Sequence, residues 1–118
     1  MTLNQPYSRL LKRGLMALVI ALGLGANAQA GGDAENGQAL SVTCAACHGA
    51  DGNSTIPTNP IIAGQYESYL IRALLDYKSG ARSNAIMAGF AAGLSEQDIK
   101  DLAAYFSNQE SSLTVPGN

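Results

Sequence analysis

Cys44-Ala45-Ala46-Cys47-His48 is the stretch around which the rest of this sequence is organised. A C-x-x-C-H run is the attachment motif of a covalently bound haem. Two thiols three positions apart on a helical turn can each form a thioether with one vinyl group of the porphyrin. The histidine that follows them then lies under the iron and can ligate it. The motif therefore predicts one haem c, with Cys44 and Cys47 as its covalent anchors and His48 as an iron ligand.

A C-x-x-C pair also occurs in structural disulfides, in thioredoxin-like redox sites and as half of a zinc site. A zinc site needs more soft ligands, but Cys44, Cys47 and His48 are the only cysteines and the only histidine of the chain. A thioredoxin-like site needs a βαβ setting, and no segment shows the alternation of a strand. The context therefore favours haem attachment.

The first thirty residues have the pattern of a secretory signal peptide. Arg9, Lys12 and Arg13 form a positively charged start, a short apolar run follows over 14–26, and Ala28-Gln29-Ala30 is a small-x-small cleavage site. The apolar run is shorter than the ~20 residues of a spanning helix, which disfavours the alternative of a retained membrane anchor. We predict export to the periplasm, cleavage after Ala30 and no membrane span thereafter.

Cleavage would leave a single domain of 88 residues, 31–118, whose tail we expect to be flexible from about residue 110. This domain has four basic and nine acidic residues, a formal net charge of −5. An acidic surface disfavours nucleic acid and anionic membranes, and it favours a redox partner with a basic docking patch. So short a chain has a limited core of its own, so a buried haem would supply much of the apolar contact area.

Hydrophobic periodicity predicts an all-α domain. Gly37 costs about 1 kcal/mol inside a helix relative to alanine, but it allows another backbone to approach closely. The predicted elements are a helix from the N-cap Asp33 to about Cys44, a turn-rich loop over 49–60, a helix over 65–78, a loop or short helix over 83–93, and a helix that begins at the N-cap Ser95 with a capping-box-like partner at Asp98.

The helix over 65–78 has an apolar stripe that includes Tyr66, Tyr69 and Tyr77. The simplest interpretation is that these tyrosines face the core. The alternative is that one or more of their hydroxyl groups reach a haem propionate, for which Arg82, Lys78 and Tyr66 are candidates.

A sixth iron ligand can be sought largely by elimination. Met1 and Met16 lie in the predicted leader, so Met87 is the only methionine of the predicted mature chain. A second strong ligand must be Met87, a deprotonated lysine or tyrosine, or nothing. Thioether sulfur binds haem iron and favours the ferrous form. Met87 lies between glycine-rich turns rather than on a periodic apolar face, which favours ligation over core filling.

Several stretches accompany the haem motif in a fixed order. With these stretches the mature sequence resembles class I c-type cytochromes over nearly its whole length, and most of all one half of the periplasmic dihaem cytochromes of the c4 type. The matching pieces are Gly32-Asp33-Ala34-Glu35-Asn36-Gly37, Cys44-Ala45-Ala46-Cys47-His48-Gly49, Ile62-Ala63-Gly64-Gln65, Tyr77-Lys78-Ser79-Gly80-Ala81-Arg82, Met87, Gly93-Leu94-Ser95 and Leu102-Ala103-Ala104-Tyr105-Phe106.

The resemblance implies a set of roles. Cys44 and Cys47 would carry the thioethers, with His48 as the proximal ligand and Met87 as the distal one. Pro60 matches the family proline whose carbonyl accepts a hydrogen bond from the proximal histidine, a contact that fixes the ring and tunes the iron.

The implied fold is a small cytochrome c domain in which the N- and C-terminal helices cross. Gly37 would lie at the crossing, against Leu102 and Tyr105. A dihaem relative would have a second such domain, which this sequence lacks. It stays open whether the face that normally meets that domain is polar here or mediates a homodimer.

We expect a periplasmic electron carrier that transfers one electron at a time through an exposed haem edge and is not an enzyme. Its partners would be membrane quinol-oxidising complexes, terminal oxidases or periplasmic dehydrogenases. One alternative is a haem enzyme or gas sensor with an open axial position, but the chain has no second histidine for acid–base chemistry there. Another alternative is an electron-entry subunit of a larger oxidoreductase complex.

Overall fold

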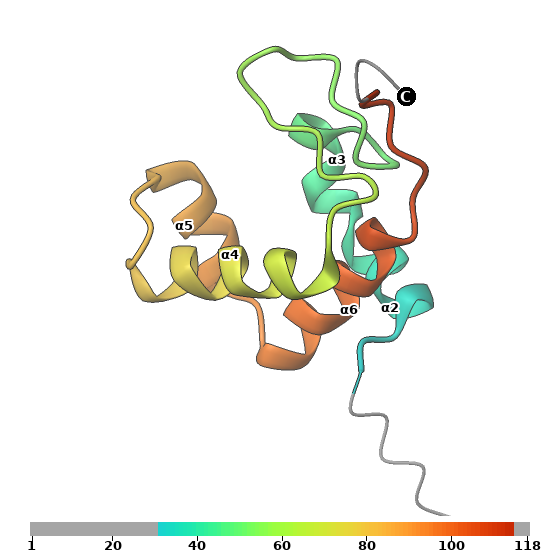
Figure 1. Cartoon of the computed structure of the whole chain (residues 1–118). Coiled ribbons are helices and arrows are strands. Elements are labelled where there is room, and N and C mark those ends of the chain that lie inside the picture. Colours follow the sequence, from blue (N-terminus) through green and yellow to red (C-terminus); the bar gives the residue numbers. More distant parts are fainter. Residues whose placement is uncertain (1–30, 115–118) are drawn as a thin grey trace, which may run out of the picture.

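The computed structural model describes residues 31–114, and this part of the chain is helical, without strands. None of its helices combines the length and apolar character that a membrane span requires. The signal peptide predicted over 1–30 lies outside the described residues. The helices are α2 (Ala34–Leu40), α3 (Val42–His48), α4 (Glu67–Ser79), α5 (Ala85–Ala92) and α6 (Glu96–Ser107), as Figure 1 shows.

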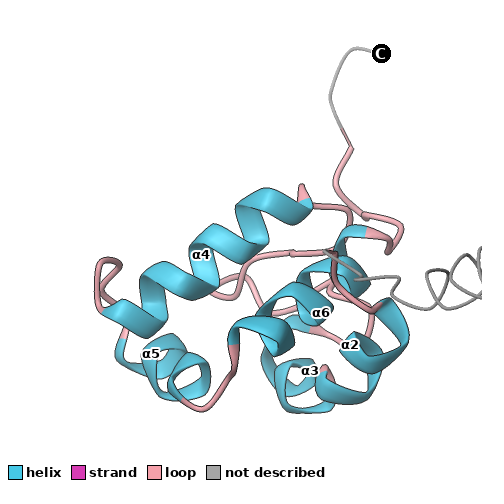
Figure 2. Ribbon diagram, turned by 90° about the horizontal axis from the view of Figure 1, so that it is seen from below, coloured by secondary structure: helices cyan, strands magenta, loops and turns pink. Residues whose placement is uncertain are grey.

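The first and last helices of the described domain, α2 and α6, pack across each other (Figure 2). Gly37 is buried at this contact, where a Cβ atom would lie 2.0 Å from the Asp101 carbonyl oxygen and 2.9 Å from the Tyr105 Cβ. Only glycine fits such an approach without moving a backbone. The expected contact with Tyr105 is present, and Asp101, rather than Leu102, provides the nearest atoms.

The haem motif lies wholly within α3. The sequence predicts one helix from Asp33 to about Cys44, but the structure has two, which meet at Ser41. The Ser41 hydroxyl donates to the Gln38 carbonyl at 2.8 Å, while its own carbonyl accepts from the Cys44 amide at 2.8 Å. Such local serine bonds compete with the regular helical pattern, so α2 ends and a new helix starts.

The core is small and centres on α6. Leu102, Ala103 and Phe106 of this helix are buried together with Leu70 of α4. Ile62 packs against this cluster from the loop before α4. Among the described helices, the backbone of α5 lies beside α4 alone and that of α3 beside α2, while Cys44 of α3 also packs against the core cluster. The core therefore joins α4 to α6, whereas α5 is attached to one neighbour alone.

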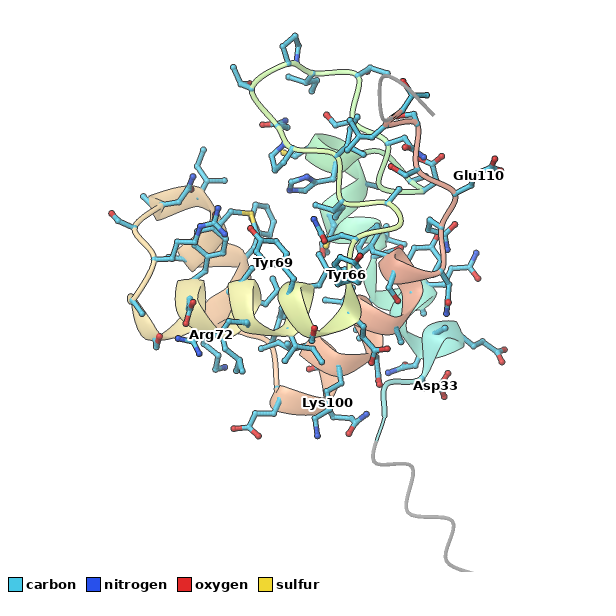
Figure 3. All side chains as sticks on the ribbon, in the orientation of Figure 1. Asp33, Tyr66, Tyr69, Arg72, Lys100 and Glu110 are labelled. Atoms are coloured by element: carbon cyan, nitrogen blue, oxygen red, sulfur yellow. The ribbon has the colours of Figure 1, made fainter. Side chains whose placement is uncertain are left out.

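The prediction that the tyrosines of α4 face the core is wrong for two of them. Tyr66 is 81% exposed and Tyr69 is 49% exposed, whereas Leu70 is only 7% exposed. Figure 3 shows Tyr69 on α4 and Tyr66 at the N-cap position just before this helix. Leu70 packs against the core residues of α6, whereas the described residues leave Tyr66 and Tyr69 largely uncovered.

Candidate haem site

Three of the candidate site residues lie on one short helix, α3. Cys44, Cys47 and His48 occupy positions i, i+3 and i+4, which share one face of an α-helix. Both cysteines are free thiols and half-buried, while His48 is 8% exposed. Burial raises the pKa of the Cys44 thiol, so this side chain is a neutral thiol near pH 7. The helix therefore presents two thiols and an imidazole to the same side.

The ring of His48 is fixed by the loop that follows α3. Its Nδ1 lies 2.8 Å from the Pro60 carbonyl oxygen. A carbonyl can only accept a hydrogen bond, so Nδ1 carries the proton and donates it. In the neutral ring, Nε2 then has the free lone pair, which is the state required of a metal ligand. The structure thus brings together the two residues, His48 and Pro60, that the resemblance pairs.

The loop is fastened to the end of α3 on one side of Pro60. The Cys47 carbonyl accepts two hydrogen bonds, from Ser54 Oγ and from Asn59 Nδ2, both at 3.0 Å. Carbonyls in the last turn of a helix have no partner within the helix, so these side chains satisfy such a group. Asn59 directly precedes Pro60. The Pro60 carbonyl that binds His48 therefore lies next to a residue that is itself hydrogen-bonded to α3. Neither hydrogen bond follows from a pattern in the sequence.

Met87 comes from the opposite part of the fold, on α5. The stretch predicted as a loop or short helix forms this helix because Asn84 caps it: Asn84 Oδ1 accepts from the amides of Ile86 and Met87, each at 3.0 Å. The Met87 side chain is half-buried. Asn84 thus fixes the backbone of the candidate ligand itself.

The other end of α5 is held by a lysine. Lys78 Nζ donates to the Ala92 carbonyl at 3.2 Å and to the Leu94 carbonyl. A cation is favourable at a helix C-terminus, where carbonyl groups are left without partners. Lys78 was a candidate for a propionate contact, and lysine was one alternative for the sixth ligand. In the structure its ammonium group is engaged with the end of α5.

Arg82 lies among the tyrosines beyond the end of α4. One guanidinium nitrogen donates to Tyr69 Oη at 3.3 Å, and the Arg82 Cζ lies 4.8 Å from the centre of the Tyr77 ring. The hydrogen bond to Tyr69 is the main reason that the pKa of Arg82 is raised. The side chain is exposed and stays available to an anionic group near Tyr69.

Several large apolar side chains are exposed on α5 and at the start of α4. They are Tyr66 and Tyr69, together with Ile86, 68% exposed, and Phe90, 51% exposed, both from α5. Exposed apolar side chains of this size are typical of residues that cover a bound apolar group. The donor set consists of two thiols, an imidazole nitrogen and a thioether sulfur, which is the set that a covalent haem with two axial ligands requires.

Comparison with known proteins identifies a cytochrome c domain in this chain. The family model described as cytochrome c matches residues 34–110. Cytochrome c4 of Pseudomonas aeruginosa is 48% identical over 99 residues, which cover 84% of this chain and 49% of that protein. Cytochrome c-554(548) of Halomonas halodenitrificans is 44% identical over 82 residues, which cover 67% of this chain and 99% of that protein.

Two further matches extend the comparison. The cytochrome subunit of sulfide dehydrogenase of Chlorobaculum tepidum is 42% identical over 72 residues, which cover 61% of this chain and 64% of that protein. The crystal structure of reduced cytochrome c4 from Pseudomonas stutzeri matches with a TM-score of 0.67 and 46% identity, over 70% of this chain and 48% of that one. The chain thus spans about half the length of its cytochrome c4 relatives.

Proposed function

This chain belongs to the cytochrome c family and is of the c4 type, and on that premise we propose that it is a periplasmic carrier of single electrons. Its cofactor is haem c, held covalently. When bound, this group supplies an iron that alternates between the ferric and ferrous states. The observation that carries the proposal is the geometry of His48, whose Nδ1 is tied to the Pro60 carbonyl at 2.8 Å. Its Nε2 is thereby prepared as a ligand, on the opposite side of the domain from Met87.

Each site residue then has a distinct task. Cys44 and Cys47 would hold the haem through thioethers, and His48 would ligate the iron through Nε2. Met87 would provide a thioether sulfur as the second ligand, and such a sulfur favours the ferrous form. Pro60 keeps the imidazole in one orientation and increases its basicity as a ligand. With His48 and Met87 both as ligands, no substrate would need to reach the metal, and electrons would pass through an exposed edge of the haem.

The partners that we propose are other redox proteins. Membrane oxidoreductase complexes, terminal oxidases and periplasmic dehydrogenases all exchange single electrons and suit a carrier that loses its signal peptide on export to the periplasm. The acidic surface suits a basic docking patch on such a partner. In this proposal the chain has no catalytic activity of its own.

A second candidate function is that of an electron-entry subunit. It is favoured by the Chlorobaculum tepidum relative, which is named as the cytochrome subunit of a sulfide dehydrogenase. The two functions share their chemistry and differ in what the chain is bound to. Gel filtration of the native periplasmic extract separates them. A carrier elutes at the mass of the free chain, whereas a subunit co-elutes with a larger catalytic protein.

Optical spectroscopy tests the ligand set. We expect ferric wild-type protein to be low-spin and to show the weak far-red band of thioether ligation. Met87→Ala should abolish that band and open the iron to cyanide and, after reduction, to carbon monoxide, because the alanine side chain has no donor atom to offer the iron. A high-spin wild-type spectrum with ready binding of these ligands would contradict the carrier function and support an enzyme or gas sensor.

Acid extraction tests the covalent attachment independently. Haem should stay with the wild-type polypeptide in acidified organic solvent, and Cys44→Ala or Cys47→Ala should weaken its retention. Full extraction of haem from wild-type protein would show that the thioethers are absent, whatever the axial ligands are.

A further inference from the structure

The segment that follows α6 turns back along the loop that follows α3 (Figure 1). The two segments meet at Asn53. Its side-chain Nδ2 donates to the Glu110 carbonyl at 2.9 Å, and its Oδ1 accepts from the Ser112 amide at 2.7 Å. One side-chain amide therefore pairs with the tail backbone as a neighbouring strand would. We call these two hydrogen bonds the Asn53 clasp.

Asn53 itself is held in place by Asp51. The Asp51 carboxylate accepts from the Asn53 amide at 3.0 Å and from Asn53 Nδ2 at 2.9 Å. These two bonds lower the pKa of Asp51, so the carboxylate is charged and accepts at neutral pH. The hydrogen bonds to Asp51 therefore orient the Asn53 side chain toward the tail, in addition to the two bonds of the clasp.

The tail also lies against the far end of the same loop. The Gly64 amide donates to the Phe106 carbonyl at 2.9 Å. A Cβ atom on Gly64 would lie 3.1 Å from the Ser111 Cβ, and the positive φ of Gly64, 67°, also favours glycine. At the near end, the Tyr105 hydroxyl donates to the Ala50 carbonyl at 3.0 Å. The end of α6 and the tail thus bind the loop before and after Pro60.

The contacts continue from the clasp to Pro60. The Gly52 carbonyl, next to Asn53, accepts from the amides of Ile62 at 2.8 Å and Ala63 at 3.1 Å. On the other side of Pro60, Asn59 is bound to the end of α3. Pro60 has no amide hydrogen of its own, so its position depends on these neighbours. A loop held at both sides keeps the Pro60 carbonyl in hydrogen-bonding distance of His48.

We propose that Asn53 is a positioning residue for His48. By clasping the C-terminal tail it fixes the loop that carries Pro60, and through that loop it maintains the hydrogen bond from His48 Nδ1. The role deepens the proposed function and rests on it in one respect, namely that His48 is the haem ligand. The tail after α6 then contributes to the position of His48, although none of its described residues forms a hydrogen bond with His48 or Pro60.

The exchange of the His48 Nδ1 proton with solvent reports on this hydrogen bond directly. We would measure it by NMR on the ferrous holoprotein labelled with 15N. Asn53→Ala should accelerate this exchange by about tenfold, the change that corresponds to losing roughly one hydrogen bond that holds the loop. Asn53→Asp keeps an acceptor for the Ser112 amide but places a second carboxylate against Asp51 and against the Glu110 carbonyl, so its exchange should be at least as fast as that of Asn53→Ala.

Shortened chains provide a matched pair. A chain that ends at Gln109 loses both partners of the clasp and should match Asn53→Ala, whereas a chain that ends at Thr114 keeps them and should match wild type. Glu110→Ala should also have no effect, because only the Glu110 backbone takes part and its side chain points away from the loop (Figure 3). If Asn53→Ala fails to fold, the chain that ends at Gln109 provides the same measurement.

The outcomes separate a positioning role from loss of stability. Ser95→Ala weakens the cap of α6 and lowers stability without touching the clasp, so it should leave the exchange of the ring proton unchanged. Wild-type exchange rates in Asn53→Ala and in the chain that ends at Gln109 would overturn the proposal. If wild-type protein lacks the haem-shifted ring signals of a ligated His48, then the proposed function fails instead.

Discussion

The two helices that carry the candidate iron ligands are held in different ways. His48, at the end of α3, is fixed by a loop that is bound to α3, to α6 and to the tail. Met87 lies on α5, which contacts only α4 among the helices and is held mainly at its two ends, by Asn84 and Lys78. A region with fewer contacts opens locally at lower cost. We therefore expect α3 and the loop that holds His48 to stay in place until the domain unfolds. We expect α5 to be able to move Met87 away from the iron while the rest of the domain stays folded.

Substitutions at two glycines should have the largest effect and give the strongest test of this difference between the two regions. Gly37 is packed between α2 and α6, whereas a Cβ on Gly89 of α5 would meet nothing within 4 Å. Gly37→Ala should destabilise the holoprotein by about 3 kcal/mol, because a methyl group 2.0 Å from the Asp101 carbonyl oxygen forces two helices apart. The midpoint temperature of thermal unfolding, measured by far-UV circular dichroism, should fall by roughly 10–20 °C.

Gly89→Ala is the matched control from the other region. An alanine inside an unobstructed helix should stabilise it by about 0.5–1 kcal/mol, so the unfolding temperature should rise slightly. Equal destabilisation by both substitutions would mean that α5 is as tightly enclosed as the crossing of α2 and α6, and the contrast between the two regions would not hold.

The sequence predicted the features of these regions that depend on neighbours along the chain. Cys44, Cys47 and His48 form one motif, so their common face follows from helical geometry. The capping box predicted from Ser95 and Asp98 is confirmed, because both partners lie within one helical turn. Close spacing in sequence gave these predictions their strength.

Contacts between residues far apart in the sequence produce no local sequence pattern from which they could be predicted. Asn53 meets the tail over 57 and 59 residues, and Asp101 meets the start of α2 over 65 and 68 residues. A single asparagine in a turn-rich loop, or a single aspartate on a helix, looks like an ordinary surface residue in the sequence. The exposure of Tyr66 was missed for a related reason: periodicity shows that a helix has an apolar face, but not which partner covers each part of it.

A buried carboxylate at the same helix crossing gives the second test of the rigid region. Asp101 is 2% exposed and accepts from the Asp33 amide at 2.8 Å, Asn36 Nδ2 at 2.6 Å and Gln97 Nε2 at 2.8 Å. Burial alone would raise the pKa of Asp101, but these hydrogen bonds outweigh it and lower the pKa below its usual value. Asp101→Asn should cost about 2 kcal/mol at pH 7, because it removes the charge that strengthens these bonds.

This effect should depend on pH in one direction. Since the pKa of Asp101 is lower in the folded state, its contribution is complete above the unfolded-state value near 4 and is lost as the pH falls toward the folded-state value. The difference in unfolding temperature between wild type and Asp101→Asn should therefore narrow below about pH 4. Glu67→Gln, at an exposed position in α4, is the control, with little effect at any pH. A difference that stays constant down to about pH 2 would show that the charge is not what Asp101 contributes.

The smallest expected effect discriminates most sharply, because it makes the same chemical deletion once in each region. Asn84 caps α5 by accepting from the Met87 amide at 3.0 Å, and Ser95 caps α6 by accepting from the Asp98 amide at 3.0 Å. Replacing either cap with alanine should cost about 1 kcal/mol of stability.

If the two regions are held as differently as their contacts indicate, the loss of the α6 cap should destabilise the whole domain. The loss of the α5 cap should mainly destabilise α5. In Ser95→Ala, the midpoint temperatures of the far-red thioether band and of the helical circular dichroism signal should fall together, by about 4–8 °C. Asn84→Ala should lower the midpoint of the thioether band more than that of the helical signal, because α5 can release Met87 while α2, α3 and α6 stay folded. Identical shifts of both signals in both variants would mean that the methionine side unfolds only with the rest of the domain.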